Sequence, residues 1–210
     1  MKILFYGDSI TDAGRNFNAE DGYLSSYGYG YPLCVAGELL AKDPTKYEII
    51  NRGISGNRIV DLYARIKADV WNHQPDVISI LIGINDIWHE LGKKNGVDLP
   101  RFEKVFQMMI EDTLARLPNA KIVILEPFVL HGYATDEFFE EFSQIKAYAA
   151  AEKKIADKFG LDWVPLQKTL DKAARQFGAA YFLDDGVHPT VAGARLIADE
   201  WLKYFKTIDK

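Results

Sequence analysis

The stretch KILFYGDSITDAGRN, residues 2–16, joins a continuous apolar run directly to a polar segment. The apolar run ends at Gly7, and Asp8, Ser9 and Thr11 follow at once. A continuous apolar run, rather than an alternating one, is typical of a strand that is buried on both faces of a parallel sheet. A serine after such a strand is most often a turn or cap residue. Whether Ser9 has a further role depends on what the rest of the chain places beside it.

The rest of the chain alternates between short apolar runs and longer segments with helical periodicity. The further strand candidates lie at 47–52, 76–83, 121–127 and 161–166. The helix candidates, in which apolar residues recur with a period of 3.6, lie at 32–42, 59–73, 99–117, 137–159, 166–177 and 190–205. Thr190 is the expected N-cap of the last helix. This alternation predicts one α/β domain over 1–210, a three-layer α/β/α sandwich around a five-stranded parallel sheet.

Composition excludes several classes of protein. The 210 residues are 48% hydrophobic and 26% charged, with a formal net charge of -5 and no basic run, so nucleic acid is not expected as a partner. No apolar stretch approaches the ~18 residues of a membrane helix. The apolar start is too short for a signal peptide, so we expect a cytoplasmic protein. The single cysteine, Cys34, excludes an internal disulfide and lies in an apolar stretch typical of a buried structural thiol.

Ligands of open parallel sheets bind at the carboxyl ends of the strands. The residues that follow each predicted strand are therefore the candidates for chemistry. Ser9 follows the first strand, GISGN with Gly53 the second, GINDIW with Asn85 the third, and PFVLHG with His131 the fourth. We expect these residues to meet at one edge of the sheet.

The segment LDDGVHPT, residues 183–190, holds the best candidate for a catalytic base. A turn over residues 185–188 can bring the carboxylate of Asp185 back to the imidazole of His188, which then acts as a general base through its other nitrogen. Alternatively, this segment is a solvent-exposed loop in which an aspartate and a histidine occur near each other without a catalytic role. Asp184 is an alternative candidate for the carboxylate that orients His188. Of the other histidines, we expect His73 near a helix end at the surface and His89 in a loop.

Three groups could stabilise a tetrahedral oxyanion, which requires donors that already point at it. These are the N–H of Ser9, the N–H of Gly53 and the side-chain amide of Asn85. Each has a plainer interpretation, as a cap, a tight turn and an Asx-turn respectively. The occurrence of all of them, with His188, at one predicted edge favours an acyl-transfer site.

Four blocks of the chain resemble the motifs of the SGNH hydrolases, the GDSL esterase family. They are GDSIT at 7–11, NRGISGNR at 51–58, GIND at 83–86 and DGVHP at 185–189. The resemblance implies a flavodoxin-like SGNH hydrolase fold, a Ser9–His188–Asp185 triad and an oxyanion hole from Ser9, Gly53 and Asn85. It also implies catalysis without a metal or organic cofactor. The G-x-S-x-G pattern of ordinary α/β-hydrolases is absent.

Within this family the sequence most resembles bacterial intracellular acetyl-xylooligosaccharide esterases. That resemblance implies a serine esterase for short acyl groups, with an acetylated oligosaccharide as its small-molecule partner. A broad carboxylesterase or lysophospholipase-like acyl hydrolase is the alternative, and a non-catalytic carbohydrate-binding protein on the same fold is another. We expect Asp8, Tyr27, Trp88 and His131 to contact substrate, although aromatic residues here could instead pack loops or a subunit contact. The sequence leaves open whether the chain forms a homo-oligomer.

Overall fold

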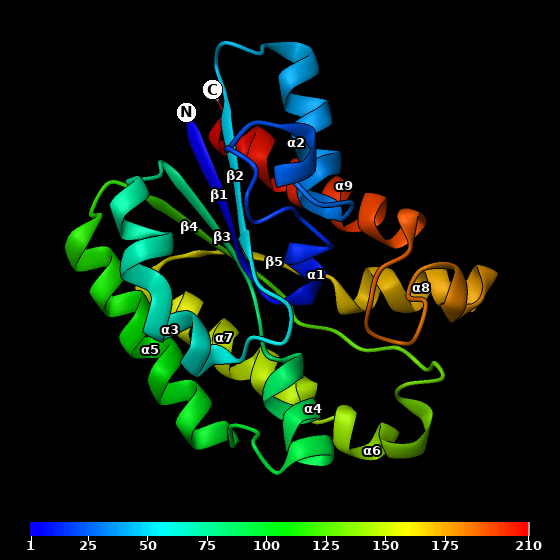
Figure 1. Cartoon of the computed structure of the whole chain (residues 1–210). Coiled ribbons are helices and arrows are strands. Elements are labelled where there is room, and N and C mark those ends of the chain that lie inside the picture. Colours follow the sequence, from blue (N-terminus) through cyan, green and yellow to red (C-terminus); the bar gives the residue numbers. More distant parts are fainter. Residues whose placement is uncertain (210) are drawn as a thin grey trace.

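The computed structural model describes residues 1–209 and has a five-stranded, fully parallel sheet at its centre (Figure 1). The strand order is β2-β1-β3-β4-β5, the order of doubly wound flavodoxin-like sheets. The strands are β1 (Lys2–Gly7), β2 (Glu48–Gly53), β3 (Val77–Leu81), β4 (Lys121–Leu125) and β5 (Asp162–Val164). The prediction of an α/β sandwich around a five-stranded parallel sheet is confirmed.

Helices cover both faces of this sheet. The helices are α1 (Ser9–Asp12), α2 (Tyr31–Lys42), α3 (Ile59–Asp69), α4 (Ile84–Lys93), α5 (Leu99–Arg116), α6 (Phe139–Phe142), α7 (Ile145–Phe159), α8 (Gln167–Phe177) and α9 (Val191–Ile208). Helices α2 and α9 pack together on one face, and α3, α5 and α7 form the layer on the other (Figure 1). Short 3₁₀ turns occupy Leu24–Ser26, Trp71–His73, Asp136–Phe138 and Ala179–Tyr181.

Three predicted segments differ from the observed elements. The segment after the third strand, expected as a loop, is the helix α4, so His89 is helical. The predicted helix over 59–73 ends as α3 at Asp69 because Val70 leaves helical geometry (φ -125°), and a 3₁₀ turn follows. The predicted helix over 137–159 is divided into a 3₁₀ turn, α6 and α7.

Two buried polar side chains of the core form hydrogen bonds between elements. Trp201 of α9 is fully buried, and its indole N–H donates to the hydroxyl of Ser79 in β3 over 3.1 Å. Asn51 in β2 donates through its amide nitrogen to the carbonyls of Thr11 (2.7 Å) and Tyr27 (2.8 Å). Because a buried donor left unpaired is costly, Asn51 fixes α1 and the following loop over the end of β2.

No helix within residues 1–209 is long and apolar enough to cross a membrane. Cys34 is half-buried at the side of the core rather than fully buried, and burial raises the pKa of its thiol.

Candidate active site

Ser9 is the first residue of α1 and stands directly above the end of β1. Gly7 permits this short connection, since a Cβ there would lie 2.4 Å from both the Leu81 carbonyl and the Thr11 hydroxyl. Asp8 caps the helix, with its carboxylate accepting the N–H of Ile10 over 3.0 Å. The first N–H groups of a helix have no acceptor within the helix, so the backbone N–H of Ser9 is available to a ligand.

His188 connects Ser9 to Asp185 through two short contacts. The Oγ of Ser9 lies 2.8 Å from Nε2 of His188, and Nδ1 of His188 lies 2.7 Å from Oδ2 of Asp185. The other carboxylate oxygen, Oδ1, accepts the backbone N–H groups of Val187 (2.8 Å) and His188 (2.7 Å). The two oxygens of Asp185 therefore have different tasks: one holds the turn and the other holds the imidazole ring.

The turn is held from outside by the segment after β4. Gly186 has a φ of 101°, which favours glycine, and its carbonyl accepts the N–H of Leu130 over 2.9 Å. A Cβ at Gly186 would lie 2.4 Å from the hydroxyl of Thr135. This close approach fixes the position of Asp185, and hence of His188.

The electrostatics of the pair follow from these contacts. Burial alone would raise the pKa of Asp185, but hydrogen bonds from the His188 ring and from two backbone N–H groups outweigh it and hold the pKa at about 2. The hydrogen bond to Asp185 raises the pKa of His188, although burial opposes this shift. Asp184 is exposed and accepts only a long hydrogen bond from Tyr133 (3.4 Å). Asp185, and not Asp184, contacts the imidazole.

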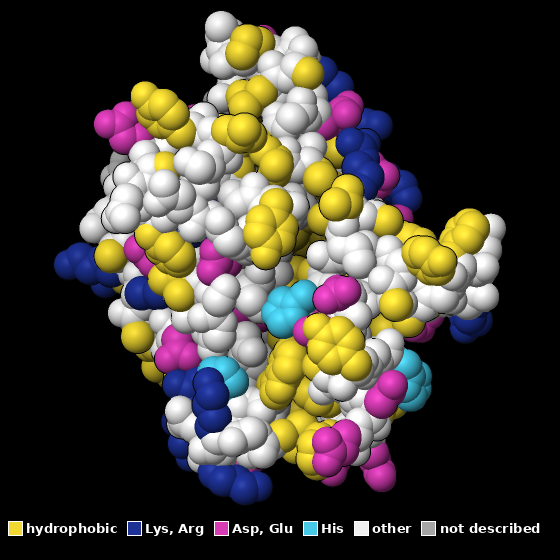
Figure 2. Space-filling view, turned by 45° about the vertical axis from the view of Figure 1, so that its right-hand side comes forward, with side chains coloured by type: hydrophobic (Ala, Val, Ile, Leu, Met, Phe, Trp, Pro, Cys, Tyr) yellow, Lys and Arg dark blue, Asp and Glu magenta, His cyan; other side chains and the backbone are white. Residues whose placement is uncertain are grey.

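A pocket of about 430 Å³ opens beside Ser9 and His188, a volume within the usual range for ligand sites. Figure 2 shows a histidine side chain near the centre of one face of the molecule, with apolar and acidic side chains around it. The pocket is lined by Ser9, Ser55, Gly56, Asn85, Trp88, His89, Gly92, Lys93 and His188.

The prediction of an oxyanion donor at Gly53 is wrong. Gly53 is the last residue of β2, and its N–H already donates to the side chain of Asn51 over 2.8 Å. A Cβ at Gly53 would lie 2.2 Å from the backbone nitrogen of Asp12, so glycine is required there for the packing of α1. Gly56, three residues later, lines the pocket at a φ of 81°. Within residues 1–209 its N–H has no backbone or side-chain acceptor.

Sequence reasoning missed Gly56 because it ended the second strand one residue too early. The predicted strand ended at residue 52, whereas Gly53 pairs in register with Gly7 and belongs to the sheet. The second glycine of GISGN is therefore the first one that lies in the loop.

Asn85 is placed by the first turn of α4. Its side chain is 6% exposed, and Nδ2 donates one hydrogen to the carbonyl of Asn57 over 3.1 Å. An amide nitrogen has two hydrogens, so the second remains available to the pocket that Asn85 lines. The neighbouring Asp86 is buried on the other side of the helix, where it accepts the N–H of Ile59 (3.1 Å).

Of the four expected substrate contacts, only Trp88 lies in this pocket. Its ring centre is 5.8 Å from that of His188, and Phe142 packs edge-on against its other side. Asp8, Tyr27 and His131, which were also expected to contact substrate, do not line the pocket. Asp8 is 1% exposed, so its carboxylate serves the helix cap, and burial raises its pKa to about 7.

Tyr27 and His131 also lie away from the pocket. Tyr27 is 5% exposed and is held in the loop before α2, where its hydroxyl donates to the carbonyl of Gly22 over 3.3 Å. His131 stacks on Phe139 at 3.6 Å and pairs with Asp136 at 2.8 Å, next to a separate cavity. Neither side chain lines the space around Ser9.

No group of three or more histidine, cysteine or acidic residues in the described chain is arranged to hold a metal ion.

Comparison with known proteins gives the family. GDSL-like lipases and acylhydrolases match residues 5–196. The chain belongs to this family. It is 33% identical over 207 residues to an acetylxylan esterase of Geobacillus stearothermophilus, covering 96% of this chain and 92% of that protein. The match makes this GDSL-like acylhydrolase a carboxylic ester hydrolase.

Solved structures of the family have the same fold. The crystal structure of the Geobacillus stearothermophilus esterase superposes with a TM-score of 0.85, at 33% identity, over 96% of this chain and 92% of that one. A GDSL-like lipase structure from Parabacteroides merdae gives a TM-score of 0.89 at 38% identity, over 96% and 94% of the two chains. Two further solved forms of the esterase are catalytic mutants in which a serine and an aspartate are replaced by alanine.

Proposed function

We propose that this acylhydrolase is a serine esterase that removes acetyl groups from acetylated oligosaccharides, with xylooligosaccharides as the favoured class. The observation that carries the proposal is the unbroken line of contacts from Ser9 Oγ through the His188 ring to the Asp185 carboxylate, at 2.8 and 2.7 Å. A hydroxyl within hydrogen-bond reach of an imidazole that a third group orients is the arrangement of an activated nucleophile.

In the first step, Nε2 of His188 takes the proton of Ser9 while Oγ attacks the ester carbonyl carbon. Asp185 keeps the proton of the ring on Nδ1 and stabilises the imidazolium that forms. The tetrahedral intermediate then collapses, the bond to the sugar oxygen breaks, and His188 gives its proton to that oxygen. The products are an acetylated Ser9 and a free sugar hydroxyl.

In the second step, His188 takes a proton from water, and the resulting hydroxide equivalent attacks the acetyl carbonyl. Collapse of this intermediate releases acetate and returns the proton to Ser9 Oγ. In both steps the developing oxyanion is stabilised by three donors: the N–H of Ser9, the N–H of Gly56 and Nδ2 of Asn85. Such donors are preorganised here by the helix start, the β2–α3 loop and the Asn57 carbonyl, and each is worth about 3 kcal/mol in related sites.

The proposed substrate class is supported by the residues that line the pocket and by the activity named for the related esterase. The lining of the pocket combines small residues and polar side chains with the indole of Trp88, which can cover the apolar face of a sugar ring. The acetylxylan esterase relative supports an acetyl group as the acyl part and a xylan fragment as the alcohol part.

Release of acetate from acetylated xylooligosaccharides tests the proposal, measured beside 4-nitrophenyl esters of increasing chain length. We expect Ser9→Ala and His188→Ala to lose nearly all turnover. The matched variants Ser25→Ala, at an exposed serine of the 3₁₀ turn Leu24–Ser26, and His131→Ala should retain it, because neither residue lines the pocket. A preference for long-chain esters would favour the broader acyl hydrolase instead. Binding of oligosaccharide without any acetate release would favour a non-catalytic carbohydrate-binding protein.

A further inference from the structure

One face of α4 forms a wall of the pocket. The residues that line the pocket from this helix are Asn85, Trp88, His89, Gly92 and Lys93. They follow the spacing i, i+3, i+4, i+7 and i+8, which places them along a single stripe of the helix. The stripe begins at the proposed oxyanion donor and leads away from Ser9 to the end of the helix.

The acidic residues of α4 face a different cavity. Asp86 and Glu90 line a space on the other side of the helix, together with Val97 and Tyr148. The carboxylate of Asp86 accepts the N–H of Ile59, and that of Glu90 accepts the N–H of Gly96 over 3.1 Å. The wall that faces the substrate therefore has no carboxylate, although the whole chain has a net charge of -5.

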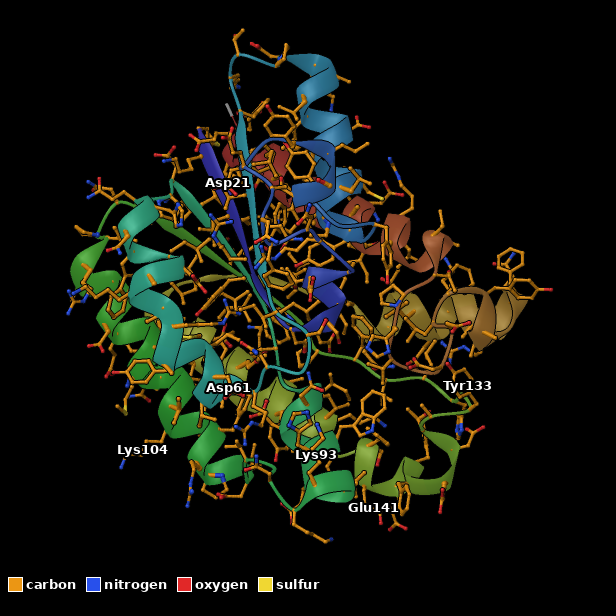
Figure 3. All side chains as sticks on the ribbon, in the orientation of Figure 1. Asp21, Asp61, Lys93, Lys104, Tyr133 and Glu141 are labelled. Atoms are coloured by element: carbon orange, nitrogen blue, oxygen red, sulfur yellow. The ribbon has the colours of Figure 1, made fainter. Side chains whose placement is uncertain are left out.

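Lys93 provides the charge on this wall. Its side chain is exposed, and within residues 1–209 no carboxylate forms an ion pair with it (Figure 3 labels Lys93 on α4). The nearby Arg58 is paired with Asp61 at 2.9 Å. Burial, followed by the charges of Lys93 and Arg58, lowers the pKa of His89, which therefore adds a neutral hydrogen-bonding ring.

The two ends of the pocket thus differ in the sign of their charge. Asp185 contacts the His188 ring, and the backbone of Asp184 donates to the His188 carbonyl, so both acidic residues lie at the His188 end. Lys93 lies at the far end of the α4 wall. An anionic substrate group would be repelled from the first end and attracted to the second.

We propose that Lys93 and His89 form a subsite for a carboxylate on the alcohol part of the substrate, and that the preferred substrates are acetylated oligosaccharides carrying a uronic acid. This inference rests on the proposed esterase function. Lys93 lies about two helical turns beyond Asn85, or ~12 Å along the axis, and an acetyl group of two carbons cannot span that distance. Gly92 leaves the path open, because a Cβ there would meet nothing within 4 Å.

A lysine in the last turn of a helix also interacts favourably with the helix dipole. Lys94, the C-cap residue of α4, has the same relation to the dipole but does not line the pocket. The variant Lys94→Gln is therefore a matched control that removes a neighbouring charge outside the proposed subsite.

The experiment compares kcat/KM for two acetylated xylooligosaccharides of equal length, one neutral and one carrying a single glucuronic acid, with 4-nitrophenyl acetate as the reference ester. At low ionic strength the wild-type enzyme should favour the acidic substrate three- to tenfold. Lys93→Gln should reduce that ratio to about one, Lys93→Arg should preserve most of it, and Lys94→Gln should leave it as in the wild type. Salt at ~1 M, where the Debye length is ~3 Å, should also remove the preference.

Equal kcat/KM values for the two oligosaccharides in the wild type would overturn the subsite while leaving the esterase assignment intact. A Lys93→Gln variant that loses activity on both oligosaccharides in the same proportion would also overturn the subsite. Lys93 would then maintain the structure of the pocket and would not bind the carboxylate of the substrate. If no acetyl ester, including 4-nitrophenyl acetate, is hydrolysed, both proposals fail.

Discussion

Replacing Asp185 by asparagine should damage catalysis far more than folding, and the direction of its hydrogen bonds explains why. In the native turn, Oδ1 of Asp185 accepts two backbone N–H groups, and Oδ2 faces Nδ1 of His188. An asparagine must keep its carbonyl oxygen toward the two backbone donors, because an NH₂ group there would leave them unpaired. Its NH₂ group is then forced toward Nδ1 of the ring.

This orientation selects the wrong tautomer of His188. An NH₂ group donates to Nδ1, so the ring proton must move to Nε2, and Nε2 can no longer accept the proton of Ser9. The loss of kcat known for an acid-to-amide change in a Ser-His-Asp triad is about 10⁴-fold, or ~5 kcal/mol of transition-state stabilisation. The turn keeps its two backbone hydrogen bonds, so the free energy of unfolding should change by no more than ~1 kcal/mol.

The assay is steady-state hydrolysis of 4-nitrophenyl acetate, with thermal unfolding measured on the same samples. Asp184→Asn is the matched control, and we expect it to retain most of the wild-type kcat because Asp184 is exposed and does not contact the ring. A kcat for Asp185→Asn within tenfold of the wild type would refute the reasoning, as would a larger loss for Asp184→Asn.

Three variants and one change of condition test separate parts of the site. The kcat/KM should fall as the pH drops through the raised pKa of His188, because only the neutral ring can take the proton of Ser9; a flat profile between about pH 5 and pH 8 would contradict a histidine base. Gly53→Ala should lower the free energy of unfolding by ~1–3 kcal/mol through its clash with Asp12 but leave kcat nearly unchanged. Gly56→Ala should lower kcat, because a residue with a Cβ is strained at a φ of 81° and the N–H that faces the pocket would be displaced. A loss of kcat in Gly53→Ala but not in Gly56→Ala would favour Gly53 as the donor. Gly92→Leu should leave the stability of the helix unchanged or increase it by up to ~1 kcal/mol, but it should raise KM for acetylated xylooligosaccharides. An unchanged KM would show that the substrate does not contact the α4 wall.

The elements that the sequence predicted well are those whose pattern is local. The five strands are apolar runs buried on both sides, and their predicted positions agree with the observed ones to within a few residues. The shared turn, with Gly186 between the two residues, made a pairing of Asp185 with His188 possible, but it was the family resemblance that favoured Asp185 over Asp184. The position of Ser9 at the edge of the sheet followed from the predicted end of β1 alone.

Features that depend on packing between distant segments were not predictable in the same way. Gly53 is glycine because α1 crosses over it, and nothing in GISGN alone distinguishes that role from the pocket position of Gly56. Tyr27 belongs to an aromatic-rich loop, but only the folded chain shows its burial. Helix α4 was expected as a loop, because its polar and charged residues lie on two sides of the helix, where they line two different cavities, and do not form one polar face.

The proposed mechanism requires Ser9 to be the nucleophile, and a fluorophosphonate probe tests this most directly because two serines, Ser9 and Ser55, line the pocket. Ser9 Oγ contacts His188, whereas Ser55 Oγ donates to Asp12 over 2.6 Å. Intact-mass measurement followed by peptide mapping should find one adduct, on Ser9, that is lost in Ser9→Ala and forms much more slowly in His188→Ala. An adduct on Ser55, or labelling that persists in Ser9→Ala, would contradict the proposed mechanism.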